Sequence, residues 1–172
     1  MILEQVFLQL PLMFGFKKTV DSLGMDLFGL PTIWQVVSAI SFFLLVEDTC
    51  AYFLHRALHW GPLYKHIHKF HHTYTAPFGL AAEYGHPAET LLLGIGFTSG
   101  PTIWSQTSNT LHVFTMFVWL TVRLVTTVDT HSGYDFPWAI HHFFPLWSGS
   151  DHHDLHHQVC RFWVCILLTF FL

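Results

Sequence analysis

Charged side chains are scarce in this chain. Only 10% of its 172 residues are Asp, Glu, Lys or Arg, whereas 52% are hydrophobic and the mean hydropathy is +0.42. A soluble domain usually carries about a quarter charged residues, so this composition is typical of a membrane protein. The net charge is only -4 and the seven Lys and Arg form no dense patch. Nucleic acid is therefore excluded as an expected partner.

Cysteine is equally rare. Cys50, Cys160 and Cys165 are too few and too scattered for a zinc ribbon or a disulfide framework. The first 18 residues also lack the basic start and small-residue cleavage site of a secretory signal. No shift in composition marks a second domain. We therefore predict one domain over residues 1–172, of the all-α class, folded as an integral membrane helical bundle.

Long apolar runs are what the sequence does contain. Residues 27–46 are uncharged and mostly apolar, which is enough to cross roughly 30 Å of hydrocarbon. No Pro or Gly interrupts residues 32–60, so this helix is predicted to continue to Gly61. The apolar tract over residues 90–128 is too long for one crossing. Its central glycines, with Pro101 and a polar run after it, predict a break and hence a hairpin of two membrane segments.

Histidine is the abundant polar residue, with 15 copies. The motifs HRALH, HKFHH and HDLHH space their histidines by three or four residues, which places the rings on one face of a helix. Adjacent histidines diverge by about 100° on a helix, so one motif can serve two metal ions. One ion cannot use all the nitrogens on offer. The predicted ligands are His55, His59, His68, His71, His72, His131, His153, His156 and His157.

The candidate ligands exclude some metal ions but do not identify one. Many nitrogens and few carboxylates exclude magnesium and calcium, and the lack of paired cysteines argues against structural zinc. Imidazole suits iron, copper and zinc alike. Metal-bound imidazoles usually donate their second N–H to a carboxylate or carbonyl, so we expect Asp48 and Asp154 around the ligands. His86 is expected there too, or in a substrate pocket.

Positive side chains predict which side of the membrane holds the histidines. For the three motifs to meet, the chain between them must cross the bilayer an even number of times. Two lysines lie beyond the first span, and five cationic residues lie on the histidine side. Cationic residues concentrate on the cytosolic side, so the metal site is predicted to face the cytosol. The two sets are Lys17 and Lys18 against Arg56, Lys65, Lys69, Arg123 and Arg161.

The histidine motifs together resemble the fatty acid hydroxylase superfamily, membrane non-haem di-iron enzymes marked by HxxxH, HxxHH and a later HxxHH. The segments EDTCAYFLHRALHWGPLYKHIHKFHH, APFGLAAEYGHPAE and DTHSGYDFPW are similar to its sterol C4-methyl oxidase branch. This resemblance covers most of residues 45–157. It implies that the histidines of the three boxes are iron ligands, with His131 of HSGYDFPW joining them.

The resemblance also implies cofactors, partners and a location. Two irons would use dioxygen and NAD(P)H-derived electrons, delivered by a microsomal b-type cytochrome and its reductase. The substrate would be a 4,4-dimethyl or 4α-methyl sterol within the lipid of the endoplasmic reticulum membrane. The oxidised product would pass to a sterol C4 decarboxylating dehydrogenase, which is a further possible partner.

Other functions stay open at this point. The same boxes occur in fatty acyl hydroxylases and desaturases. The chain also starts late relative to the superfamily and departs from its pattern after His157, so we expect a truncated chain with an atypical tail. A catalytically inactive metal-binding membrane protein is therefore an alternative. A metal transporter fits less well, because its histidines should line a path across the bilayer.

Overall fold

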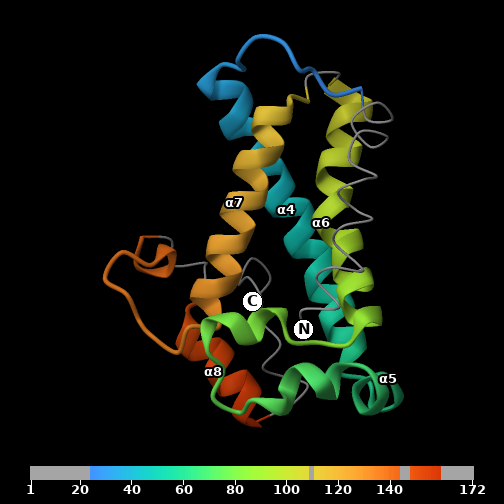
Figure 1. The fold of residues 1–172 in the computed structure, drawn as a ribbon, viewed down its shortest axis with the longest axis vertical. Helices are drawn as coiled ribbons and strands as arrows, with labels where there is room; N and C mark the ends of the chain where they lie inside the picture. Colours follow the sequence, from blue (N-terminus) through green and yellow to red (C-terminus); the bar gives the residue numbers. More distant parts are fainter. Residues whose placement is uncertain (1–23, 109–110, 144–147, 160–172) are drawn as a thin grey trace.

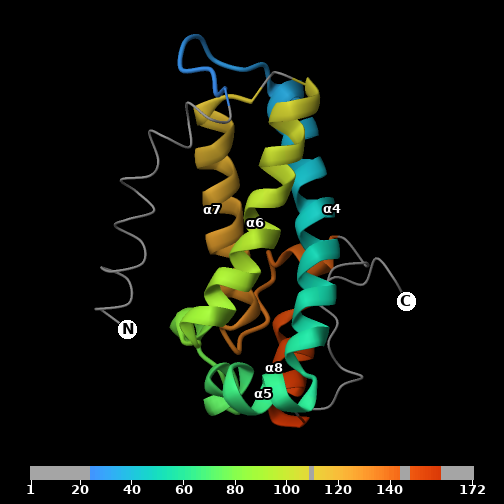
Figure 2. The ribbon, with the colours of Figure 1, turned by 90° about the vertical axis from the view of Figure 1, so that its right-hand side faces the viewer.

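Three long helices lie side by side, and shorter helices gather at one end of them (Figures 1 and 2). The computed structural model describes residues 24–108, 111–143 and 148–159. Within these ranges there is no strand, only an isolated bridge between Asp26 and His112, so the predicted helical class is confirmed. The elements are α4 (Ile33–Leu58), α5 (Gly61–His66), η2 (His68–Thr73), η3 (Gly79–Glu83), α6 (Pro87–Ser108), α7 (Val113–Thr130), η4 (Ile140–His142) and α8 (Ser150–Val159).

Helix α4 begins later than predicted but then runs unbroken to the first histidine motif. Thr32 caps it, because its hydroxyl accepts from the Gln35 N–H while the Gln35 side chain accepts from the Thr32 N–H. Residues 27–32 are not helical, so the predicted start was too early. Because no helix breaker follows, the last turn of α4 presents His55 and the chain leaves the helix at His59.

The apolar tract after Pro87 forms two helices, as predicted, and the first of them ends within the predicted polar run, at Ser108, not at the glycines or Pro101. Helix α6 runs through its glycines and Pro101 to Ser108, and α7 starts at Val113. The glycines serve close packing instead of a turn. A Cβ at Gly100 would lie 2.9 Å from the Cα of Phe43, and one at Gly96 would lie 3.4 Å from the Cβ of Cys50. Small residues at these positions let α6 approach the backbone of α4.

Aromatic residues fill the space between the three helices. The fully buried Phe43 and Trp119 meet edge to face, with ring centroids 5.6 Å apart. Trp119 also stacks on Phe97 and donates its indole N–H to the Phe97 carbonyl at 3.2 Å. Lower along the same helices, Arg123 of α7 pairs with Glu47 of α4 at 2.6 Å. These contacts fix α4, α6 and α7 relative to one another, and with them the ends that carry histidines.

The second histidine motif does not lie on one continuous α-helix. Gly61 and Pro62 open α5, and that helix stops at His66. Ile67 takes a non-helical backbone conformation (φ -122°, ψ -67°), after which η2 continues as a 3-10 helix. The tighter helix has about three residues per turn, so neighbouring histidines in this motif diverge even more strongly than on an α-helix.

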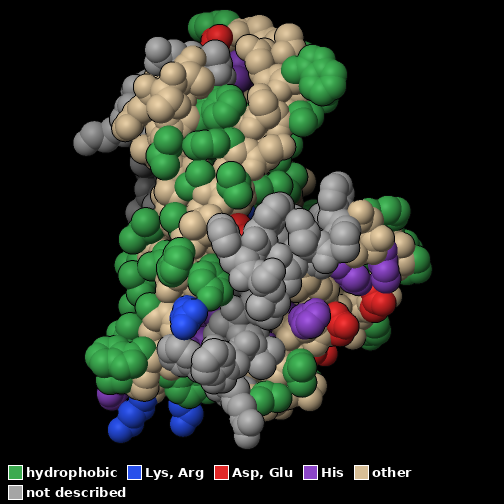
Figure 3. All heavy atoms as spheres, turned by 180° about the vertical axis from the view of Figure 1, so that it is seen from behind, with side chains coloured by type: hydrophobic (Ala, Val, Ile, Leu, Met, Phe, Trp, Pro, Cys, Tyr) green, Lys and Arg blue, Asp and Glu red, His purple; other side chains and the backbone are tan. Residues whose placement is uncertain are grey.

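The outer surface of the long helices is apolar (Figure 3). Trp34 of α4 is 78% exposed and Phe117 of α7 is 58% exposed. By length and composition, α4 and α7 are each sufficient to cross a membrane. Contiguous apolar surface of this kind marks a contact with lipid or with another protein.

Candidate metal centre

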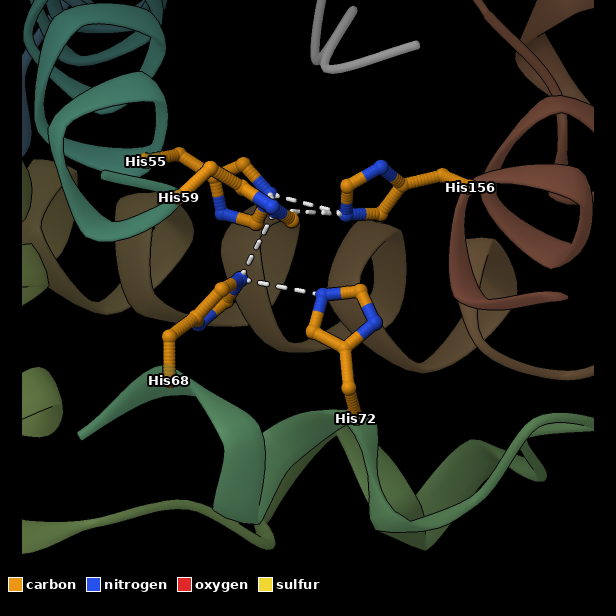
Figure 4. Close-up of side chains that lie close together, drawn as sticks. All are labelled: His55, His59, His68, His72 and His156. Carbon is orange, nitrogen blue, oxygen red and sulfur yellow. Dashed lines mark hydrogen bonds between the residues drawn. The ribbon is translucent and has the colours of Figure 1, made fainter. Parts of the chain in front are cut away.

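Five histidine rings converge at the end of α4 (Figure 4). Their Nε2 atoms form a chain of close approaches: His55 to His156 at 3.0 Å, His59 to His55 at 3.3 Å and to His156 at 3.2 Å. His68 extends it, with its Nε2 3.1 Å from His59 and 3.0 Å from His72. All five residues are buried. We call this set the five-histidine group: His55, His59, His68, His72 and His156.

Four more rings form a second group beside the first. The Nε2 of His131 lies 3.3 Å from that of His71 and 2.9 Å from that of His153. The Nε2 of His157 lies 3.0 Å from that of His153. These residues are buried as well. The four-histidine group is His71, His131, His153 and His157.

The two groups share the elements that build them. The 3-10 helix η2 gives two rings to the five-histidine group and sends His71 to the other. Helix α8 gives His156 to the first group and the remaining pair to the second. The divergence predicted for HKFHH and HDLHH therefore occurs. All nine histidines singled out in the sequence lie in one group or the other; their role as ligands stays a proposal.

The spacing of the nitrogens suits metal ions. Two nitrogens bound to one ion at 2.0–2.1 Å lie about 2.9 to 3.4 Å apart for right-angled to tetrahedral arrangements. The close approaches between Nε2 atoms in both groups fall between 2.9 and 3.3 Å, and all candidate ligand atoms of a group lie within 4.8 Å of one another. The rings thus already stand at the distances that a shared ion requires.

The hydrogen bonds behind the rings decide which nitrogens carry protons. In the four-histidine group, the Nδ1 atoms of His71, His131 and His157 face the backbone carbonyls of Tyr84, Thr127 and Tyr74 at 3.3, 2.8 and 3.1 Å. A carbonyl only accepts, so these Nδ1 atoms donate. A neutral imidazole has one N–H. The facing Nε2 atoms of His71 and His131 are therefore bare, and a cation between them removes the repulsion of their lone pairs.

Protons are poor candidates for that cation. Burial, aided by neighbouring rings, lowers the pKa of His71 and His153 far below the usual range. Burial likewise lowers the pKa of His131 to about 4, and burial with the His131 charge lowers that of His157 to about 4. In the other group, burial lowers the pKa of His59 to about 4 and that of His156 to about 3. Neutral imidazoles are the form that binds metals.

One carboxylate behind the site was missed by the sequence prediction. The Nδ1 of His68 donates to the Oε1 of Glu89 at 2.8 Å, and both side chains are almost fully buried. Glu89 stands in the first turn of α6. One indication of its role was present in the sequence: Glu89 is a single acidic residue at the start of a long apolar tract, directly after the residues HPA. This carboxylate fixes the His68 tautomer and turns its Nε2 toward the other rings.

The residues predicted around the ligands lie elsewhere in part. Asp48 is buried in α4, but its Oδ1 contacts no hydrogen-bond partner within the described residues, and its neighbour Glu47 pairs with Arg123. His86 begins α6, since its Nδ1 accepts from the Ala88 N–H at 3.1 Å. Asp154 lies on α8 close to Gly133. No hydrogen bond from these three to a ring of either group occurs in the described residues.

The histidines expected outside the ligand set do lie outside both groups. His112 caps α7 by accepting from the Phe114 N–H at 2.9 Å. His66 and His152 are exposed. His141 and His142 form a separate cluster with Asp135.

The family model for fatty acid hydroxylase matches residues 40–171 of the chain. The chain belongs to the fatty acid hydroxylase family. The matched range contains all nine clustered histidines and Glu89. No solved structure matches the chain significantly.

Curated proteins similar to this chain have names that refer to sterols and other lipids. The methylsterol monooxygenase erg25B of Aspergillus fumigatus is 48% identical over 158 residues, covering 91% of this chain and 53% of the relative. The C-4 methylsterol oxidase of Candida albicans is 51% identical over 124 residues, 72% of this chain and 40% of the relative. A very-long-chain aldehyde decarbonylase of Oryza sativa subsp. indica is 42% identical over 160 residues, 92% and 58%.

These matches confirm the resemblance to sterol C4-methyl oxidases stated from the segments around the histidine boxes. The chain spans about half the length of the curated relatives it matches.

Proposed function

We propose that this chain forms the metal-binding part of a membrane di-iron monooxygenase that oxidises the C4 methyl group of 4,4-dimethyl or 4α-methyl sterols. Each histidine group would hold one iron. When bound, iron would supply the activation of dioxygen, with electrons derived from NAD(P)H. One observation supports this proposal above the others. The Nε2 atoms of His71 and His131 face each other without a proton on either, an arrangement that only a cation between them can stabilise.

The apolar helices support a place in the membrane. Helix α8, which carries histidines of both groups, lies at one end of α4, α6 and α7 (Figure 2), and the exposed sides of these helices are rich in large apolar residues. A planar, apolar sterol can reach the site from the bilayer. We place the histidine end at the cytosolic face of the endoplasmic reticulum, where a b-type cytochrome and its reductase can deliver electrons. Lys17, Lys18 and Arg161, on which this orientation partly depends, lie outside the described residues.

The protein's own groups have defined tasks in this proposal. The carbonyls of Tyr84, Thr127 and Tyr74 hold three rings in one tautomer. The carboxyl group of Glu89 does the same for His68, and such a partner raises the basicity of the ring. Burial keeps the rings neutral, so no proton competes with the metal near pH 7. The geometry is thereby set before any ligand arrives.

A second candidate comes from the rice relative. Its name describes a reaction on very-long-chain aldehydes, and its identity to this chain is close to that of the sterol enzymes. A linear lipid substrate is therefore the main competitor to a sterol. The other competing hypothesis is that the chain is a catalytically inactive metal-binding protein.

Metal analysis of the purified full chain tests the site. We expect about two irons per chain, because two separate nitrogen clusters of four and five rings are present. The exposed His66 provides a matched control: His66→Ala removes one imidazole and should leave the iron content unchanged. Less than one iron per chain would overturn the metal assignment.

Turnover tests the substrate separately. Cells lacking sterol C4 demethylation, supplied with this chain, should convert 4,4-dimethyl sterols to C4-oxidised products. Conversion of very-long-chain aldehydes with no sterol oxidation would select the second candidate. Normal iron content with neither conversion would select the inactive metal-binding protein.

A further inference from the structure

A third cluster of metal-binding side chains lies outside the two histidine groups. His141 and His142 belong to η4, and Asp135 stands six residues before His141 in the segment that follows α7. Their candidate ligand atoms all lie within 4.8 Å of one another. Figure 3 shows histidine and acidic side chains together on the surface near this segment. We propose that Asp135, His141 and His142 form a third metal site of the zinc class.

The geometry brings the same ring nitrogen of both histidines to one carboxylate oxygen. The Nε2 of His141 lies 2.9 Å from the Oδ1 of Asp135, and the Nε2 of His142 lies 2.8 Å from it. The two ring centroids are 4.2 Å apart. Ligands around tetrahedral zinc stand about 3.3 Å apart, so shifts of a few tenths of an ångström admit an ion. Exposure allows such shifts, because the Asp135 side chain is 59% accessible and that of His142 is 39% accessible.

The charge around the cluster favours a cation. Asp129 lies close enough for the charges of His141 and Asp135 to act on it. A Cβ at Gly149 would lie 2.8 Å from the Oδ1 of Asp151 and 2.9 Å from the Nδ1 of His141, so Asp151 approaches the same ring. Residues 124–160 contain no Lys or Arg. Three acidic side chains therefore lie beside the two rings with no Lys or Arg in the surrounding sequence, an arrangement that favours a divalent cation.

The ligand set indicates which ion would bind. Two imidazoles and one carboxylate with open positions suit zinc, which accepts three protein ligands and a water molecule. The site differs from the buried groups because it is open to solvent, so its ion exchanges freely. An ion here would tie Asp135 to η4, the 3-10 helix that precedes α8 in the chain, and α8 carries His153, His156 and His157.

Zinc binding to the full chain, with its iron sites loaded beforehand, tests the proposal. In equilibrium dialysis against buffered Zn²⁺, the wild-type chain should take up one exchangeable zinc per chain. Asp135→Asn and His142→Ala should each weaken that binding by more than about 10-fold, a loss already typical of an outer partner of a metal ligand. His66→Ala removes an exposed histidine elsewhere and should bind zinc like the wild type.

Two further measurements separate the site from general damage. Iron content should stay unchanged in both variants, which shows that the chain still folds. Zinc should slow hydrogen exchange over residues 134–143 in the wild type but not in His142→Ala. Equal zinc uptake by the wild type and His142→Ala, or no exchangeable zinc in the wild type, would overturn the proposal and leave the iron site unaffected.

Discussion

The five-histidine and four-histidine groups are built alike but held differently. In the smaller group, three rings donate their Nδ1 protons to backbone carbonyls. In the larger group, His68 donates to the buried carboxylate of Glu89. A carbonyl orients a ring, whereas a carboxylate also adds negative charge behind it. Backbone carbonyls therefore orient the rings of the four-histidine group, and no side-chain mutation removes them. In the five-histidine group, one ring is oriented by a side chain, which mutation can remove.

The number of rings gives the largest expected difference between the groups. His71→Ala leaves three nitrogens in its group, whereas His156→Ala leaves four in the other. We expect His71→Ala to reduce the iron content by about one per chain, and His156→Ala to weaken iron binding with a smaller loss of content. Both variants should lose sterol oxidation, because the charge and geometry of the centre change. Iron quantification with a turnover assay measures this; wild-type turnover in either variant would contradict the ligand assignment.

Glu89 offers a way to disturb one group alone. Glu89→Leu leaves the Nδ1 of His68 without an acceptor, and we expect metal affinity in the five-histidine group to fall by roughly 10- to 100-fold. Glu89→Gln keeps an acceptor without the charge and should restore part of the affinity. Competition with a chelator, followed by the optical or EPR spectrum of the iron, reports on it. Glu83→Gln, on an exposed acid in η3, is the matched control.

An equal loss of metal from both groups in Glu89→Leu would contradict the separate anchoring of the two groups. It would mean that Glu89 supports the packing of α6 instead of one ring.

The two groups also differ in how far the sequence predicted them. Spacing within HRALH, HKFHH and HDLHH predicted eight of the nine clustered residues, because helical periodicity is local, and His131 came from the segment HSGYDFPW. The division of His71 from His72 followed from the same argument. Glu89 could not be found in this way, since its contact with His68 joins residues 21 positions apart. Asp48 shares a helix face with His55, but its Oδ1 has no hydrogen-bond partner within the described residues, so its place around the ligands stays a prediction.

The fold was predicted with similar limits. The unbroken course of α4 followed from the lack of Pro and Gly, and the hairpin followed from length. The end of α6 in the polar run also followed, but the glycines predicted to break the helix do not do so, because glycine has two uses. Gly100 reads as a turn signal in the sequence, yet in the structure it is the point where α6 touches Phe43. Only the neighbouring helix decides between these uses.

The packing of α6 on α4 supports both groups, so weakening it should affect them equally. Gly100→Ala places a methyl group 2.9 Å from the Cα of Phe43, and such overpacking typically costs about 1 to 3 kcal/mol. Gly94→Ala meets nothing within 4 Å and should be neutral or stabilising by up to about 1 kcal/mol. Thermal unfolding of both variants in detergent tests the pair. Equal melting temperatures would show that the α4–α6 contact is looser than described.

The smallest expected difference is the response of the metal-free groups to acid, because burial acts on both. The pKa of His59 and that of His131 are each lowered to about 4, whereas an unfolded histidine titrates near 6.5. Between these values the unfolded chain binds more protons than the folded chain. The stability of the metal-free protein should therefore fall as the pH drops from about 6.5 to 4. Chemical denaturation of chelator-treated protein across this range measures it, and stability that rises toward pH 4 would mean that the rings are protonated when folded. Iron should flatten the curve above pH 5, since bound rings cannot take up protons.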